Sequence, residues 1–143
     1  MSTPIPTTDQ STATKSGSIA LGLFILRLGA GLSLFLKHGW EKLIGYSTMV
    51  QHFPNPIHIG AHASLAFALL SDGICSVLVI IGFATRPAAA IILINLLTAF
   101  FLVHHAAFFS NPHVELVWAY IAVFAAILLT GPGGISIDAR LKR

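Results

Sequence analysis

The chain has 143 residues, of which 55% are hydrophobic and only 9% are charged, and its mean hydropathy is +0.83. Ordinary soluble domains have about 25% charged residues, and eight basic and five acidic side chains could not cover a soluble fold of this size. The apolar composition also excludes a disordered chain, and a single cysteine, Cys75, excludes a disulfide scaffold. The composition therefore predicts an integral membrane protein, and at about 20 residues per span the chain has room for four helices.

The chain starts with a polar segment that four apolar segments follow. Residues 1–18 are rich in Ser, Thr and Pro, which predicts a disordered tail, and no basic patch leads directly into an apolar run as in a signal peptide. The apolar segments predict one all-α domain over residues 19–139, an antiparallel four-helix bundle, followed by a basic end at 140–143. The predicted spans cover residues 19–38, 61–84, 87–107 and 114–131.

Basic residues at the span ends predict the orientation, because Lys and Arg gather on the cytoplasmic side of membrane proteins. Five of them fall on one side of the predicted bundle and two on the other: Lys15, Arg86, Arg140, Lys142 and Arg143 against Lys37 and Lys42. This pattern predicts that both termini are cytoplasmic. The basic residues on the cytoplasmic side also account for the net charge of +3, so the charge does not indicate a nucleic-acid partner.

Titratable side chains gather on the predicted outer side. All seven histidines lie there, at span ends or in loops, together with Glu41 and Glu115. Polar side chains near span ends usually turn away from lipid, which favours an inward orientation for His38, His104 and Glu115. The alternative for the loop histidines is that they only lie at the membrane interface and have no chemical role. The sequence therefore predicts that any chemistry lies in the outer half of the bundle.

Two charged residues lie deeper. Arg27 falls near the middle of the first predicted span and Asp72 near the middle of the second. An unpaired charge at such a depth costs about 2.5–3.5 kcal/mol on insertion scales, and antiparallel neighbours place the two residues at similar depth, which predicts an ion pair. The pair would either fix the register of the two spans or form the polar floor of an outward-facing pocket that tunes a redox group or relays protons.

Helical spacing predicts a polar stripe along the first span, which includes Arg27. Steps of three and four residues place on one face Arg27, Gly31, Leu34, His38 and Glu41 or Lys42. We therefore include His38, Glu41 and Lys42 among the candidate ligand-binding residues. On the third span, Asn95 and Thr98 are typical of hydrogen bonds between helices.

Metal and haem binding are further alternatives. His58 and His62 have the i, i+4 spacing that puts two ligands on one helix face, provided that the second helix starts that early. Haem would need histidines on facing spans, and His38 and His104 are the available pair. The sequence has no flavin or iron–sulfur motif, so a substrate oxidation would need a partner protein.

Several short motifs occur together in the order of one family. Residues 26–31 and 38–43 resemble the first span of the DoxX family, residues 53–60 resemble its loop, and residues 82–87 resemble its Gly-Leu-x-Thr-Arg corner. His104, Glu115 and residues 131–138 complete the pattern. The resemblance implies a four-helix protein of the bacterial inner membrane. The family usually has Glu where this chain has Asp72, which keeps the charge on a side chain shorter by one methylene.

The resemblance also implies a function. The family's name comes from a small subunit of a thiosulfate:quinone oxidoreductase, which implies a membrane subunit of a quinone-linked redox system acting with a partner subunit. In this hypothesis His38 and His104 hydrogen-bond a quinone carbonyl, while Glu115, or Asp72 in the floor, exchanges protons. The alternatives are a non-enzymatic anchor or assembly factor that binds a redox or periplasmic partner through the outer loop 39–60, and a small-molecule or metal permease. Homo-oligomers are compatible with each of these.

Overall fold

The computed structural model describes residues 8–106 and 112–141, and their regular secondary structure is entirely helical. In chain order the elements are α1 (Thr8–Leu34), η1 (Phe35–Gly39), α2 (Trp40–Ile44), α3 (Tyr46–Met49), α4 (Ala61–Leu69), η2 (Leu70–Cys75), α5 (Ser76–Ile81), α6 (Thr85–Thr98), η3 (Ala99–Val103), α7 (Pro112–Thr130) and α8 (Ile137–Leu141). The three η elements are π-helical segments that continue the preceding α-helix. The predictions for residues 1–7, 107, Lys142 and Arg143 fall outside the described residues.

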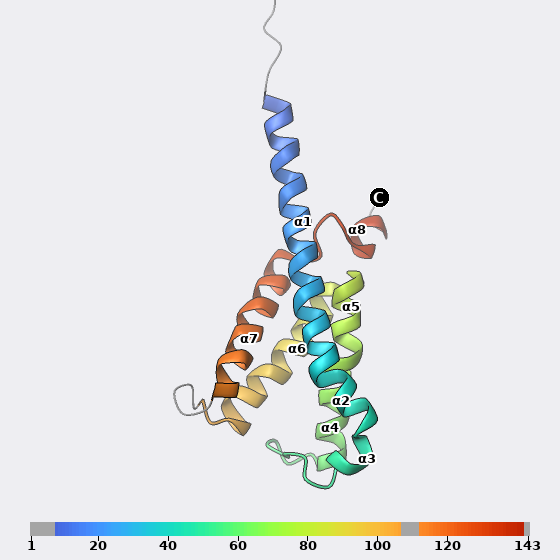
Figure 1. Cartoon of the computed structure of the whole chain (residues 1–143), viewed down its shortest axis with the longest axis vertical. Helices are drawn as coiled ribbons and strands as arrows, with labels where there is room; N and C mark the ends of the chain where they lie inside the picture. Colours follow the sequence, from blue (N-terminus) through green and yellow to red (C-terminus); the bar gives the residue numbers. More distant parts are fainter. Residues whose placement is uncertain (1–7, 107–111, 142–143) are drawn as a thin grey trace, which may run out of the picture.

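Consecutive elements combine into longer helices, which we call rods and number in chain order, with α7 as the last (Figure 1). Three rods in the described residues are long and apolar enough to cross a membrane, namely Thr14–Ile44, Ala61–Ile81 and Thr85–Val103. These correspond to the first three predicted spans. The apolar part of α7, Val114–Thr130, is shorter. The all-helical, membrane-type fold predicted from composition is therefore confirmed.

The first rod is longer at both ends than the sequence predicts. The predicted disordered tail extends to residue 18, whereas α1 begins at Thr8, and Figure 1 shows the first half of α1 projecting beyond the other helices. A helix that is already nucleated extends at little cost per residue. At the other end the helix continues through η1 and α2 to Ile44, and α3 follows after a turn at Gly45, so part of the predicted loop 39–60 is helix.

The rods pack as antiparallel neighbours. The first rod lies along α5, and α6 lies along α7 (Figure 1). Between them lie fully buried apolar side chains from three rods, including Val79, Ile92 and Phe124, each 0% exposed. At the lower end of the bundle α4 makes no extensive contact with α6 or α7 among the described residues. This divergence leaves space for the cavity described below.

Gly39 sets the approach of the first two rods. A Cβ atom built on Gly39 would lie 2.8 Å from the carbonyl carbon of Asp72 and 2.9 Å from the Cα of Gly73. These are backbone atoms, which cannot rotate away. The rods therefore cross here at a distance that only glycine allows.

Gly39→Ala is expected to destabilise the protein by about 1–3 kcal/mol, the usual cost of overpacking. The measurement is thermal unfolding of the purified protein in mild detergent. Gly29→Ala is the matched control, because a Cβ at Gly29 meets nothing within 4 Å and alanine favours the helix. Equal melting temperatures for the two variants would contradict the close crossing.

Candidate functional site

A cavity of about 580 Å³ lies among the lower parts of the rods. Each rod contributes to it, and so do the three π-helical segments, through Lys37 and His38 of η1, Asp72 of η2, and Ala99 and Val103 of η3. Such segments occur frequently at functional sites. Most of the remaining wall is apolar, and the polar or titratable lining residues are Lys37, His38, Lys42, Ser64, Asp72, Asn95, Thr98, His104 and Tyr120.

Asp72 is the centre of the polar part of the cavity. It is only 4% exposed, and its carboxylate accepts hydrogen bonds from three neighbours. Lys42 Nζ lies 2.8 Å from Oδ2, and Ser71 Oγ and Asn95 Nδ2 lie 3.0 and 3.1 Å from Oδ1. Lys42 also donates to the carbonyl oxygen of His38 at 3.3 Å. Asp72, Lys42 and Asn95 therefore form a charged floor that joins the first three rods.

The predicted ion pair between Arg27 and Asp72 is wrong, because Asp72 pairs with Lys42 instead. The first rod continues to Ile44, which brings Lys42 to the depth of Asp72. The antiparallel register then places Arg27 near the other end of the second rod, where its guanidinium donates to the carbonyl of Val79 at 3.3 Å. Arg27 also does not line the cavity.

Arg27 belongs to a second polar cluster, at the opposite end of the bundle. It is 1% exposed and also donates to the carbonyl of Ile135, in the segment that leads to α8. Asp138 of α8 accepts hydrogen bonds from the backbone N–H groups of Ala84 and Thr85 at 2.8 and 3.0 Å and from Thr85 Oγ1 at 3.0 Å. Its carboxylate thus caps the start of α6, and the cluster ties the C-terminal segment to the bundle.

Asp138 was not predicted to be a cap. Thr85 starts α6, but Ala84 before it has a left-handed backbone and no capping side chain. A helix start without Ser, Asp or Asn is a signal that the cap comes from elsewhere in the chain. The partner itself is 53 residues away, so only the structure identifies it.

The remaining predicted site residues do not line the cavity, and each of them is exposed: Glu41 in α2, Glu115 in the first turn of α7, His58 before α4, and His62 in α4. The condition for metal binding by His58 and His62, that one helix carries both, is not met, because α4 begins only at Ala61. His58 therefore does not share a helix face with His62. Over the residues whose placement is described, no group of three His, Cys, Asp or Glu is arranged to hold a metal ion.

His38 and His104, in contrast, both line the cavity, as the inward orientation predicts. The His38 ring meets Tyr120 edge-on, with centroids 6.4 Å apart. The Tyr120 hydroxyl lies 2.6 Å from Ser33 Oγ, either atom being the donor. Tyr120 was not predicted to belong to the site, although a tyrosine inside an apolar span needs a partner for its hydroxyl. Asn95 bonds to another rod as predicted, whereas Thr98 bonds to Ile94 of its own helix.

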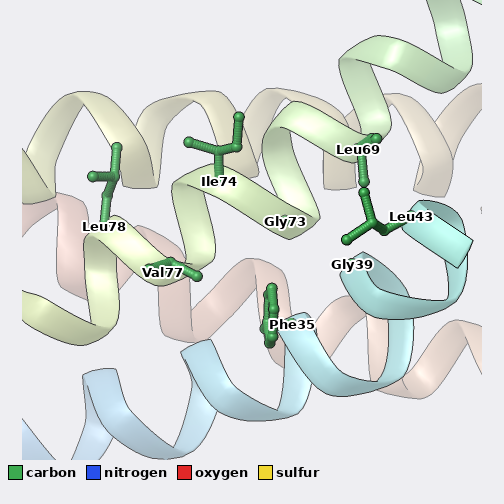
Figure 2. A pocket seen from close by; sticks show the side chains of 8 residues that line it. All are labelled: Phe35, Gly39, Leu43, Leu69, Gly73, Ile74, Val77 and Leu78. Carbon is green, nitrogen blue, oxygen red and sulfur yellow. The ribbon is translucent and has the colours of Figure 1, made fainter.

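A smaller hollow, of about 330 Å³, lies beside the crossing of the first two rods. Figure 2 shows its lining residues, which are all apolar or glycine: Phe35, Gly39, Leu43, Leu69, Gly73, Ile74, Val77 and Leu78. It offers no side chain that could bind a metal or transfer a proton. The larger cavity is therefore the candidate functional site.

Comparison with known proteins agrees with the motifs. The DoxX family model matches residues 22–105, which is more than half of the chain. The protein belongs to the DoxX family. It is 28% identical to the inner membrane protein YphA of Escherichia coli (strain K12) over 128 residues, which cover 82% of this chain and 89% of that relative. No solved structure matches.

DoxX membership and the apolar helices make the chain a membrane protein, and the similarity to YphA supports a bacterial inner-membrane location. The part that matches the DoxX model contains His38, Lys42, Asp72, Asn95 and His104. The charged floor and both cavity histidines therefore lie within the DoxX match. Tyr120 and the Asp138 cap come from the chain beyond that match.

Proposed function

We propose that the protein crosses the inner membrane four times, with both termini in the cytoplasm and α7 as the fourth span. Two observations support this topology. The apolar part of α7 lies along α6, and Arg86 and Arg140 lie at the end where Asp138 joins α8 to α6. Lys37 and Lys42 lie at the other end, by the cavity. Under the positive-inside rule the cavity then belongs to the outer half of the bundle.

Within this topology, the cavity would bind a quinone or a similar lipid-soluble carrier, and the protein would be the membrane subunit of a redox system. The observation that carries the proposal is a largely apolar cavity with hydrogen-bonding groups from several rods, of a size typical of small-molecule sites. His38 and His104, which line the cavity, would donate to a carbonyl oxygen of the carrier. The Lys42–Asp72–Asn95 floor takes the place of the predicted Arg27–Asp72 floor.

Proton exchange with such a ligand would fall to Asp72. Asp72 lines the cavity and has a carboxyl group, whereas Glu115 is exposed on α7 and does not line the cavity. Electrons would pass to or from a partner subunit, since no flavin or iron–sulfur motif occurs in the sequence. The protein's own contribution would be to bind and orient the carrier.

His104→Ala is expected to weaken the binding of a short-chain ubiquinone or menaquinone analogue about fivefold to tenfold, the effect of losing one hydrogen bond. The measurement is a titration of the purified protein in mild detergent. His52→Ala is the matched control, because His52 is exposed and does not line the cavity. Equal affinities for His104→Ala and the wild-type protein would contradict the role of His104.

A wild-type protein that does not bind either analogue would overturn the quinone proposal and favour a non-enzymatic anchor or assembly factor. One observation supports that alternative. Ile57 and Ile59, in the loop before α4, are each 52% exposed, and exposed apolar side chains of this kind suit a partner surface.

A further inference from the structure

The cavity has one wall that is not helical. Residues 53–60, which we call the strap, run between α3 and α4, and Figure 1 shows this trace reaching sideways below the bundle. Five strap residues line the cavity: Phe53, Pro54, Pro56, Ile57 and Ile59. The strap therefore fills part of the space left where α4 diverges from α6.

Among the described residues, the side-chain hydrogen bond between the strap and α4 comes from Asn55, beside a backbone bond in which the N–H of Ser64 donates to the carbonyl of Gly60 at 3.0 Å. Asn55 Oδ1 accepts a hydrogen bond from the backbone N–H of Gly60 at 3.0 Å and from Ser64 Oγ, in the first turn of α4, at 3.3 Å. The backbone carbonyl of Asn55 accepts a third, from the N–H of His58 at 3.3 Å. The hydrogen bonds found within the strap thus all involve Asn55. Asn55 itself does not line the cavity.

The strap's backbone needs such support. His58 has φ of 56° and Gly60 has φ of 97°, so two of its residues have a left-handed backbone, which is costly for a residue with a Cβ. No regular secondary structure holds this segment. Its conformation therefore depends on the side-chain bonds to Asn55, on the backbone bonds at Asn55 and Gly60, and on apolar contacts around the cavity.

We propose that Asn55 is a positioning residue for the ligand cavity: its carboxamide holds the strap across the mouth of the cavity and so slows the exchange of a bound ligand. The proposal rests on the proposed function for the identity of that ligand. Only the acceptor atom of Asn55 is used, in both side-chain bonds. Asn55→Asp keeps an acceptor near the start of α4, where a negative charge is also favourable, whereas Asn55→Ala removes it.

The closure of the strap can be measured without a ligand, through cysteine labelling. The chain has one cysteine, Cys75, so Cys75→Ala provides a cysteine-free background. Ala68→Cys then reports on the cavity, because Ala68 lines it and is 5% exposed. Ser47→Cys, at an exposed position of α3, is the matched control. The reagent is a membrane-impermeant maleimide applied to the purified full-length protein.

We expect Asn55→Ala to increase the labelling rate at position 68 about tenfold, as expected from the loss of two hydrogen bonds, and Asn55→Asp to leave it unchanged. Labelling at position 47 should be the same in every background. Equal rates at position 68 with and without the Asn55→Ala substitution would overturn the proposal, and so would an Asn55→Asp rate as high as that of Asn55→Ala. A parallel increase at position 47 would also overturn it, because it would indicate general loosening of the protein.

A second measurement connects the strap to ligand exchange. Asn55→Ala should increase the dissociation rate of the quinone analogue, whereas Asn55→Asp should keep the wild-type rate. If the wild-type protein binds the analogue and Asn55→Ala releases it at the wild-type rate, the role of Asn55 in ligand exchange is overturned. If the wild-type protein binds no analogue, the proposed function fails, and labelling at position 68 still tests the strap independently.

Discussion

Asp72→Ala is expected to destabilise the protein by about 3–5 kcal/mol, the usual cost of breaking a buried ion pair from one side. The side chains of Lys42 and Asp72 are only 14% and 6% exposed, and their charged atoms lie 2.8 Å apart. Alanine at position 72 leaves the ammonium group of Lys42 without its counter-ion and Asn95 without its acceptor. The loss is measured as the shift in thermal unfolding of the detergent-solubilised protein.

The control for this prediction removes both charges. The double variant Lys42→Met with Asp72→Leu should recover most of the lost stability, because apolar replacements of a buried ion pair are often neutral or stabilising. The double variant should, however, lose the polar floor of the cavity. The role of the pair is contradicted if Asp72→Ala has the same melting temperature as the wild-type protein. It is also contradicted if the double variant is as unstable as Asp72→Ala.

The second large effect is expected at the opposite end of the bundle. Arg27→Met should cost about 2–4 kcal/mol, because the carbonyl groups of Val79 and Ile135 lose a buried charged donor. Since the bond to Ile135 ties the C-terminal segment to the first rod, the variant should also expose residues 131–141 to protease. Both effects are measured on the same preparation, by thermal unfolding and by limited proteolysis.

Arg86→Met is the matched control for Arg27→Met. Arg86 also donates to a backbone carbonyl, that of Leu129 at 3.2 Å, but it is exposed. Its removal should therefore cost no more than about 1 kcal/mol, as for surface interactions. Comparable losses in the two variants, or a C-terminal segment that stays protected in Arg27→Met, would refute this role of Arg27.

The two polar clusters have different relations to the candidate site. The Lys42–Asp72–Asn95 floor lines the cavity, whereas the cluster of Arg27 with the C-terminal segment does not. Both contain an almost fully buried charge. Such residues are expensive in a membrane and mark either function or a required structural contact. The proposed function assigns a role to the floor, whereas Arg27 ties the C-terminal segment to the bundle.

Part of this site could be predicted from the sequence. The positions of His38 and His104 at span ends favoured an inward orientation, and both line the cavity. Asn95 was predicted to bond between helices, and it does so. Glu115 was predicted to face inward for the same reason, but it is exposed on α7. Distance from a span end indicates depth, whereas the rotation of the helix decides which way a side chain faces.

The predicted ion pair between Arg27 and Asp72 was wrong for a related reason. Hydropathy shows where an apolar run ends, but a helix can continue through charged residues, as the first rod does from His38 to Ile44. Counting depth from the end of the apolar run therefore placed Arg27, instead of Lys42, opposite Asp72. The register is decided by contacts such as that of Gly39 with the backbone at Asp72, which no hydropathy pattern contains.

The sequence by itself determined the class of this protein, the approximate extent of its apolar spans and its family, because these follow from composition and from short local motifs. Only the tertiary structure decided which charges pair, that Asp138 caps α6 from 53 residues away, and that Asn55 ties the strap to α4. Each of these depends on the register and rotation of packed helices. Those quantities arise from contacts between distant parts of the chain, where close packing allows few arrangements.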